Sequence, residues 1–479
     1  MVRRFPAVER RGFLQRKKYA MRVAIVSQPW SRVPAAPADS IGILTHQLAR
    51  HLAPLHEVTV YSRQFSEDPA VQCIEGFNVR RVPATIDRIL KPLRLLDRIP
   101  VRYPRRPFIA SRLYQFGYMH EIASDLARRG CRIVHLHNFP HCARLVRRAH
   151  PDCKIILHVH SDWLVPLDHN LISRQLRDVD LILGVSDFIT RRLRERFPDA
   201  APRCHTIYNG VDVQRFNNRF ARPPGNNGNP LGPGPVQNDG AGPAYPRLLY
   251  VGRVSPEKGV HVLIEAFERV LDRYPHATLT IAGPQIAAQR EFIDPTGAEP
   301  KLDALDGFFR HRHTYCPHLR EMLSPAASAR VRFVGNIPHE QLVEYYCQAD
   351  LCVAPSIVHE AFGLPLAESM AAGTPVVATR SGGFGEIVIE GKTGLLVERG
   401  DSADLASAIL KLAGDPALRR AMADASRQSI VDRFAWTRIL PQLLRQYDQL
   451  LGGDGDDTPP VRLNLPPVSQ QNPQVQISA

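Results

Sequence analysis

Residues 21–28 read Met-Arg-Val-Ala-Ile-Val-Ser-Gln, a short run rich in β-branched side chains that ends in a loop containing Pro and Ala. The loop leads into residues 41–53, where apolar side chains recur at roughly helical spacing, and residues 56–61 again have the composition of a strand. This order of strand, loop, helix and strand indicates the first unit of a parallel α/β sheet.

The alternation of strands and helices continues along the chain and restarts after Arg247. In the first half, further strands are predicted at 132–136, 154–159, 180–185 and 204–208. In the second half, strands are predicted near 248–252, 278–282, 331–334, 350–354 and 375–378, and helices near 258–273, 339–347, 365–372, 402–413 and 416–431. We therefore expect an α/β fold with two doubly wound, Rossmann-like parallel-sheet domains. Ligands bind beyond the carboxyl ends of the strands in such sheets, which here means the cleft between the domains.

A segment rich in Pro, Gly and Asn separates the two halves and cannot build a core, so we interpret it as a flexible linker. An amphipathic segment near the C-terminus is predicted to be a helix, and the Pro-rich residues after it are predicted to be disordered. The predicted parts are, in chain order, a basic arm (1–20), the first domain (21–216), the linker (217–246), the second domain (247–430), the C-terminal helix (431–451) and the tail (452–479).

The composition predicts a cytoplasmic protein. The chain has no apolar run of about eighteen residues, so no transmembrane helix is expected, and its basic start lacks the apolar core of a secretory signal. The eight cysteines show no CxxC pair and no zinc-ligand spacing, which is typical of reduced thiols inside a cell.

The net charge of +14 has three interpretations: solvated arginine faces, a phosphate-bearing substrate, or contact with an anionic membrane. Nucleic acid is not predicted, because no basic stripe is interleaved with exposed aromatics. Residues 80–112 are strongly basic and are consistent either with a peripheral contact at the inner face of the cytoplasmic membrane or with a solvated loop. The basic residues of this segment are Arg80, Arg81, Arg88, Lys91, Arg94, Arg98, Arg102, Arg105, Arg106 and Arg112.

The segment Glu360-Ala-Phe-Gly-Leu-Pro-Leu-Ala-Glu368 joins two glutamates to a loop that turns into a helix. Pro365 suits the first helical position and Gly373 the position just past the end, which places Glu368 in the first turn. The free N–H groups and the positive end of the helix dipole form an anion site, and Gly363 has no side chain to obstruct it. Two carboxylates that flank an anion site suit a ligand with phosphate in its middle and hydroxyl groups at both ends. A nucleotide-sugar is such a ligand.

A second segment, Tyr250-Val-Gly-Arg-Val-Ser-Pro-Glu-Lys-Gly259, follows the first strand of the second domain. Arg253 can hold phosphate oxygens with two parallel hydrogen bonds, and Lys258 supplies a compact positive charge. Together they are expected to neutralise a diphosphate as it leaves, a kind of electrostatic stabilisation in which one donor contributes on the order of 3–4 kcal/mol.

These segments resemble glycosyltransferase family 4, as do Asn209-Gly-Val-Asp212 and Gly382-Gly383…Glu386 followed by Gly391-Lys-Thr-Gly394. The resemblance covers about residues 21–450. It implies the GT-B fold, with an acceptor-side first domain, a donor-binding second domain and a C-terminal crossover helix that packs back on the first domain. It also implies retaining, metal-independent transfer from a nucleotide-sugar.

The resemblance implies roles for residues of the second domain. Arg253 and Lys258 match the residues that bind the donor diphosphate. Glu360 matches a catalytic glutamate that contacts hydroxyl groups of the donor sugar, and the backbone of Phe362-Gly363-Leu364 matches a stretch that donates to sugar and phosphate oxygens. Glu368 matches the glutamate that accepts from the ribose hydroxyls. We expect Lys258 and Glu360 to be surface groups within the cleft.

Three further residues are assigned by the same resemblance. Ile337 lies where backbone groups read the nucleobase. Gly42 is what remains of a glycine pair that lets the backbone of the first domain approach the diphosphate. His160 matches the histidine that faces the donor sugar, and we predict that it is catalytic; the alternative is a packed histidine bonded to a backbone carbonyl.

No metal site is predicted. Three further histidines lie in or near the predicted core of the first sheet and are interpreted as structural: His135, His137 and His158. Asp178-Val-Asp180 precedes a strand rather than following one, and Asp454-Gly-Asp456 lies in the predicted tail.

The predicted function is retaining hexosyl transfer from a nucleoside-diphosphate sugar to an unidentified hydroxyl acceptor, which belongs to polysaccharide, lipid-linked or small-molecule glycoside synthesis. A UDP- or GDP-sugar is favoured over an ADP-sugar, and no cofactor besides this donor is expected. Two alternatives stay open: a nucleotide-sugar epimerase of GT-B fold, and a binding protein without catalysis. Residues 285–325 are interpreted as an insertion of unknown role.

Overall fold

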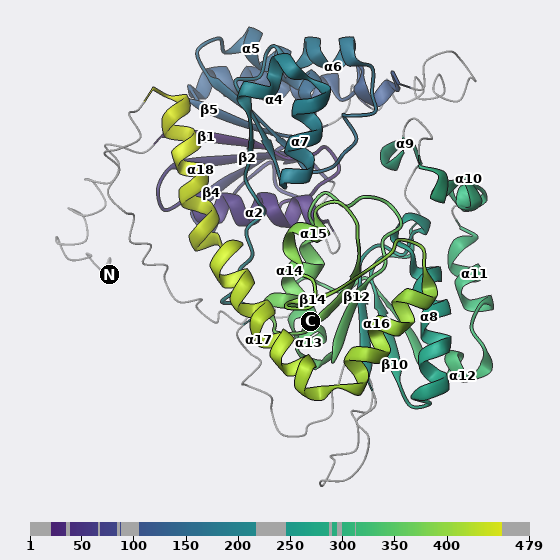
Figure 1. Cartoon of the computed structure of the whole chain (residues 1–479). Coiled ribbons are helices and arrows are strands. Elements are labelled where there is room, and N and C mark those ends of the chain that lie inside the picture. The colour runs from purple at the N-terminus through teal and green to yellow at the C-terminus, as the bar shows by residue number, and fades with distance from the viewer. Residues whose placement is uncertain are drawn as a thin grey trace, which may run out of the picture.

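The computed structural model describes residues 21–34, 39–65, 68–83, 87, 105–216, 246–286, 290–294, 299–311 and 313–452. The predicted basic arm lies outside these residues, as do nearly all of the predicted linker and tail. The described residues form two α/β domains, each built on a mainly parallel sheet with helices on both faces, as the alternation predicts (Figure 1).

The first domain has an eight-stranded sheet. Its strands are β1 (Arg22–Val26), β2 (Glu57–Arg63), β3 (Val71–Ile74), β4 (Phe77–Val82), β5 (Ile133–His137), β6 (Lys154–Val159), β7 (Leu181–Gly184) and β8 (Cys204–Thr206). They lie in the order β3-β4-β2-β1-β5-β6-β7-β8, and only the edge strand β3 runs antiparallel to its neighbour.

Alternation along the strands assigns each side chain to one face of this sheet. The helices of the domain are α2 (Ser40–Leu52), α4 (Phe116–Arg129), α5 (Ala143–Ala149), α6 (His169–Leu176) and α7 (Asp187–Arg196), and the C-terminal helix is α18 (Trp436–Leu450). Ala24 and Val26 of β1 belong to the core that α4 to α7 cover, whereas Val23 and Ile25 belong to the core that α2 and α18 cover.

The second domain has a six-stranded, fully parallel sheet. Its strands are β9 (Arg247–Val251), β10 (Thr278–Ala282), β11 (Val331–Gly335), β12 (Leu351–Ala354), β13 (Val376–Thr379) and β14 (Gly394–Val397), in the order β11-β10-β9-β12-β13-β14. Its main helices are α8 (Val260–Arg273), α13 (Leu342–Gln348), α14 (Leu364–Ala371), α15 (Phe384–Ile387), α16 (Ser402–Gly414) and α17 (Pro416–Arg433).

The sequence did not predict β3, β4 and β14, and β4 changes the interpretation of the basic segment. Arg80 and Arg81 lie in β4. Arg80 Nε lies 2.8 Å from Asp125 Oδ2, and Arg81 is 6% exposed and donates to the Val33 carbonyl at 2.9 Å. Both arginines are therefore paired inside the domain, and Arg81 is too buried to contact a membrane. Residues 88–104 of the segment lie outside the described residues.

The C-terminal helix packs back on the first domain, as predicted, but it begins at Trp436 rather than at residue 431. The chain leaves the helix at Phe434 and becomes extended at Ala435, where the Val211 N–H donates to the Phe434 carbonyl at 2.8 Å. A Cβ atom at Gly210 would lie 2.3 Å from the Trp436 ring, so this glycine allows the ring to seat against the first domain. The helix then runs along the first sheet (Figure 1).

Residues 285–325 are partly described and form short helices beside α8. These are α9 (Arg290–Ile293), η7 (Pro300–Leu305), α10 (Asp306–Arg310), α11 (Tyr315–Glu321) and, at the end, α12 (Pro325–Ser328). Leu302, Phe309 and Leu319 are buried in the core of the second domain. The described part of the insertion thus extends that core.

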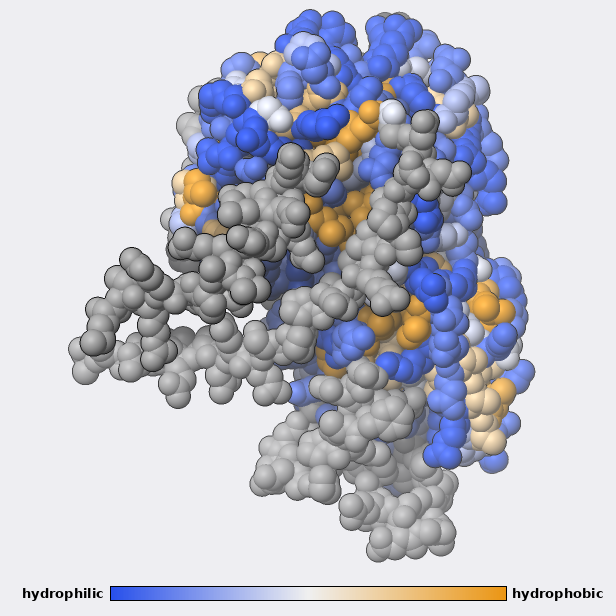
Figure 2. Space-filling model, turned by 90° about the vertical axis from the view of Figure 1, so that its left-hand side faces the viewer, coloured by the Kyte–Doolittle hydropathy of each residue, from blue (hydrophilic) through white to orange (hydrophobic). Residues whose placement is uncertain are grey.

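One face of the described part of the molecule is mainly polar (Figure 2). Figure 2 shows hydrophilic residues over most of this face and smaller hydrophobic patches toward its middle. None of the described helices is long and apolar enough to cross a bilayer.

Candidate active site

A cavity of about 310 Å³ lies between the two domains, at the carboxyl ends of strands from both sheets. The first domain contributes the start of α2, His160 after β6, and Asn209. The second domain contributes most of the wall. Nine of the ten predicted site residues line this cavity: His160, Arg253, Lys258, Ile337, Glu360, Phe362, Gly363, Leu364 and Glu368.

Gly42 is the predicted residue that does not line the cavity, although its neighbours in the first turn of α2 do. Its N–H donates to Asp39 Oδ1 at 2.9 Å, since Asp39 caps the helix. A Cβ atom at Gly42 would lie 2.8 Å from the Arg32 carbonyl oxygen. In this structure the glycine therefore serves the close packing of the helix start against the preceding loop.

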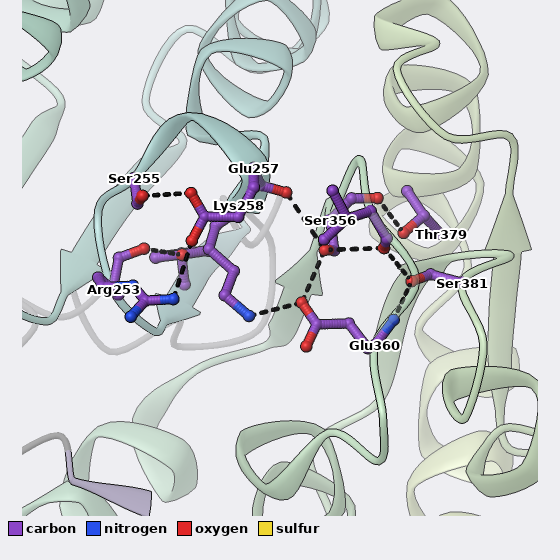
Figure 3. Close-up of polar contacts among 10 residues, drawn as sticks. Arg253, Ser255, Glu257, Lys258, Ser356, Glu360, Thr379 and Ser381 are labelled. Carbon is purple, nitrogen blue, oxygen red and sulfur yellow. Dashed lines mark hydrogen bonds and ion pairs between the residues drawn. The ribbon is translucent and has the colours of Figure 1, made fainter. Parts of the chain in front are cut away.

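The turn after β9 presents Arg253 to the cavity. The Tyr250 hydroxyl donates to the Arg253 carbonyl at 2.7 Å, and Arg253 Nη2 lies 2.9 Å from Glu257 Oε1. Glu257 is 1% exposed and also accepts from the Ser255 hydroxyl (Figure 3). The guanidinium is thus anchored on one side, and its side chain is still 41% exposed.

Lys258 and Glu360 form an ion pair in the cavity wall rather than two separate surface groups. Lys258 Nζ lies 2.6 Å from Glu360 Oε1, which also accepts from the Ser356 hydroxyl at 2.7 Å (Figure 3). The two side chains line the cleft as expected, but they are only 25% and 16% exposed and are thus more buried than free surface groups. Burial raises the pKa of Glu360, but the Lys258 ammonium and the Ser356 hydroxyl outweigh it, and the pKa of Glu360 lies below its ordinary value.

The loop that follows Glu360 turns into α14 as predicted, with two differences. Pro365 is the second helical residue, and Glu368 lies in the second turn rather than the first, because the helix starts at Leu364. Gly363 has φ +113°, and a Cβ atom there would lie 2.5 Å from the Phe384 ring. Glycine is therefore required at this position for backbone conformation and packing. Gly373 follows the helix with φ +71°, as expected of a residue past its end.

Glu368 is buried and held by two side chains that the sequence did not indicate. Its Oε1 atom lies 2.6 Å from His339 Nε2, and its Oε2 atom accepts from the Tyr346 hydroxyl at 3.1 Å. Arg215 Nη1 lies 3.1 Å from His339 Nδ1. Because the guanidinium can only donate, Nδ1 accepts and Nε2 carries the proton that faces Glu368. The carboxylate is thus oriented at the cavity wall.

Four histidines stack on one side of the first sheet. His135 and His137 come from β5, and His158 and His160 from the end of β6; neighbouring ring centroids lie 4.4 to 5.8 Å apart. His135 Nδ1 lies 3.0 Å from the Tyr447 hydroxyl of α18. Burial, and then the neighbouring imidazoles, hold the pKa of His160 well below its ordinary value, so its ring is neutral at the cavity edge.

The histidine cluster predicts a pH-dependent stability. Burial lowers the pKa of His158 to about 4, whereas an unfolded histidine titrates at about 6.5. Between about pH 6.5 and about pH 4 the unfolded chain therefore binds more protons than the folded protein. In this window the free energy of unfolding falls by up to about 1.4 kcal/mol for each unit by which the pH decreases, for each such histidine. Urea unfolding across this range measures the slope. His158→Asn is expected to flatten it, and an unchanged slope in this variant would contradict the explanation.

In the described part of the chain, no group of three or more His, Cys, Asp or Glu is placed to hold a metal ion. Asp180, from the Asp-x-Asp sequence before β7, is paired with Arg147 at 2.5 Å and accepts from the Ile155 N–H at 2.7 Å. Its role in the structure is to join β6 and β7.

Two facing α/β domains with a cation-lined cleft between them define a GT-B protein, and the family models agree. The model described as Glycosyltransferase Family 4 matches residues 41–215, and the model described as Glycosyl transferases group 1 matches residues 238–429. Together they match well over half of the chain. The chain belongs to glycosyltransferase family 4 and is a glycosyltransferase by family.

Individual relatives are similar over much of their length. Glycogen synthase of Mycobacterium tuberculosis (strain CDC 1551 / Oshkosh) is 32% identical over 310 residues, which cover 64% of this chain and 63% of that protein. Sucrose-phosphate synthase from Thermosynechococcus elongatus has a similar fold, with a TM-score of 0.67, 24% identity, and coverage of 90% of this chain and 99% of that one. Anabaena Alr3699/HepE in complex with UDP-glucose gives a TM-score of 0.59 and 18% identity, and covers 90% of this chain and 100% of that one.

Proposed function

We propose that this glycosyltransferase moves a hexosyl group from a nucleoside-diphosphate sugar to an acceptor hydroxyl, with retention of the anomeric configuration and without a metal ion. The observation that carries the proposal is the convergence of Arg253, Lys258 and Glu360 on one cavity between the two domains. Two cations beside one carboxylate suit a diphosphate attached to a sugar, with the cations on the phosphates and the carboxylate on the sugar hydroxyl groups.

In the proposed reaction, Arg253 and Lys258 stabilise the charge that gathers on the leaving diphosphate. These cations supply the positive charge that a metal ion would otherwise bring. The start of α14 adds backbone N–H groups and the positive end of a helix dipole. Glu368 is placed to accept from the ribose hydroxyls, and the backbone near Ile337 to contact the nucleobase. No cofactor besides the donor takes part.

Retention follows in this proposal from attack on the face that the diphosphate leaves, with a phosphate oxygen taking the proton of the acceptor. Among the described residues of the cavity wall, the carboxylates are Glu360 and Glu368, and both already accept hydrogen bonds from protein side chains. A covalent sugar–carboxylate intermediate is therefore disfavoured. The neutral His160 ring would hold the sugar and the acceptor in line, while closure of the cleft excludes water.

A UDP- or GDP-sugar is the proposed donor. The structural neighbour Alr3699/HepE was solved with UDP-glucose, which supports a uridine nucleotide. We propose that the acceptor is reached from the cytoplasm, and that any contact with anionic lipid headgroups uses basic residues of 88–104, which lie outside the described residues. Arg106, at the end of this basic segment, is paired with Asp168 at 3.0 Å.

Product analysis tests the proposal against the two alternatives. The protein is incubated with UDP-, GDP- and ADP-sugars, with EDTA present, and with a panel of sugar and lipid acceptors including anionic vesicles that carry lipid extracts. Free nucleotide together with a new glycoside of retained configuration is the expected result. An isomerised donor would indicate the epimerase, and unchanged donors with bound nucleotide would indicate a binding protein.

A further inference from the structure

The glutamate of the Gly382-Gly383…Glu386 segment makes a contact between the two domains. Glu386, on α15 of the second domain, accepts from the Asp187 N–H at 2.8 Å (Oε2) and from the Phe188 N–H at 2.6 Å (Oε1). Both donors belong to the first turn of α7 in the first domain. One carboxylate therefore accepts two hydrogen bonds from the start of a helix in the other domain. The donors Asp187 and Phe188 lie 199 and 198 residues before Glu386 in the sequence.

The start of α7 is suited to this contact. Ser186 caps the helix and accepts from the Ile189 N–H at 3.2 Å, which leaves the N–H groups of Asp187 and Phe188 to be satisfied by a group outside the helix. A carboxylate at the positive end of a helix dipole is stabilising. The two domains thus share a single capping arrangement, half supplied by Ser186 and half by Glu386.

Side chains around the capping arrangement reinforce the contact. The Phe188 ring lies 5.2 Å from the His359 ring, and a Cβ atom at Gly382 would lie 3.1 Å from the same Phe188 ring. The Tyr208 hydroxyl donates to Asp187 Oδ2 at 3.0 Å. Burial, and then the nearby Glu386 carboxylate, raise the pKa of Tyr208. Its hydroxyl therefore stays protonated and can donate to Asp187.

The same segment also holds the donor loop. The Gly383 N–H donates to the Glu360 carbonyl at 2.8 Å. A Cβ atom at Gly382 would lie 2.4 Å from that carbonyl oxygen, and one at Gly383 would lie 2.5 Å from the Ala361 carbonyl oxygen. Two glycines are needed for so close an approach. The next residue, Phe384, lines the cavity and packs on Gly363 at the start of α14.

We propose that Glu386 is a positioning residue that couples closure of the cleft to the geometry of the donor loop. When the domains are together, Glu386 is fixed by α7, and the Gly382-Gly383 turn holds the Glu360 loop against the cavity. When the domains separate, both hydrogen bonds to α7 break, and the turn loses its support from the first domain. The coupling to turnover rests on the proposed function, whereas the contact between domains does not.

The test compares Glu386→Ala and Glu386→Gln with Glu386→Asp, and uses Glu398→Ala as a matched control. Glu398 is an exposed carboxylate of the second domain whose side chain is paired with Arg380 of the same domain. Small-angle X-ray scattering measures the separation of the domains in each variant. Calorimetry with UDP and a donor-turnover assay then separate nucleotide binding from the chemical step.

The alanine and glutamine variants are expected to be more open in solution and to lose about tenfold or more in turnover, with a smaller change in UDP affinity, because the nucleotide contacts lie mainly in the second domain. Glu386→Asp should recover part of the turnover, and Glu398→Ala should match the wild type. Unchanged scattering together with unchanged turnover in Glu386→Ala would overturn the proposal. Altered scattering in a protein whose wild type turns over no nucleotide-sugar would support the contact and refute the proposed function instead.

Discussion

Lys258→Gln is expected to lower the turnover of a nucleotide-sugar by about 10²- to 10³-fold, the loss that follows removal of one group stabilising charge in a transition state. In the proposed reaction the ammonium group lies in the cavity wall where the leaving diphosphate gathers charge, and glutamine keeps a polar end, one atom shorter than lysine, but not the charge. Steady-state kinetics at saturating donor measure the effect. The substitution should change kcat more than KM if Lys258 acts mainly on the leaving group.

The same substitution also affects stability, because Lys258 is paired with Glu360 in a partly buried site. Removing one partner leaves a carboxylate supported mainly by the Ser356 hydroxyl, and we expect a lower melting temperature. The control is Lys411→Gln, which removes a lysine from the exposed side of α16, away from the cavity. Wild-type turnover in a folded Lys258→Gln variant would contradict the assigned role.

Glu360→Gln is the second substitution with a large expected effect. The amide keeps the shape of the side chain but weakens its bond to Lys258 and, in the proposed reaction, its bonds to sugar hydroxyl groups. We expect turnover to fall by about 10²-fold. The double variant Lys258→Gln/Glu360→Gln removes both charges together. Its stability should recover relative to the single variants, since no unpaired charge is left, whereas its turnover should stay low.

This double-mutant cycle separates two explanations of the ion pair. If the pair serves only the fold, turnover should follow stability and recover in the double variant. If both side chains act on the donor, stability and turnover should diverge. Thermal unfolding and donor turnover, measured on the same four proteins, give the answer.

The sequence predicted the strands that are buried on both faces, because such strands are continuous apolar runs in a parallel sheet. β1 and β7 are examples. It missed β3, whose residues Val71–Ile74 are largely exposed at the sheet edge and do not alternate in hydropathy. It also missed β14, which begins with a glycine and was recognised only as part of a motif. The break between α17 and α18 depends on a contact with Val211, which no local pattern contains.

The candidate site could be predicted where one short segment contains the chemistry. Arg253 and Lys258 share a turn, and Glu360 begins the loop before α14. The partners that orient such residues come from elsewhere in the chain, and sequence spacing gives no signal for them. His339 reaches Glu368 from 29 residues away, and Glu386 meets α7 across the cleft. Glu257, which precedes Lys258, belongs to the sequence motif, but only the fold shows that its buried carboxylate anchors Arg253.

Calorimetric titration of UDP, GDP and ADP into the wild-type protein and Lys258→Gln, with EDTA present throughout, tests the central claim most directly. The account predicts that one nucleotide binds the wild type without a metal ion, and that the substitution weakens this binding by about tenfold or more, in line with the loss of one charge-assisted contact to phosphate. The account would be contradicted if a folded wild-type protein bound none of the three nucleotides. It would also be contradicted if Lys258→Gln bound the nucleotide as tightly as the wild type does.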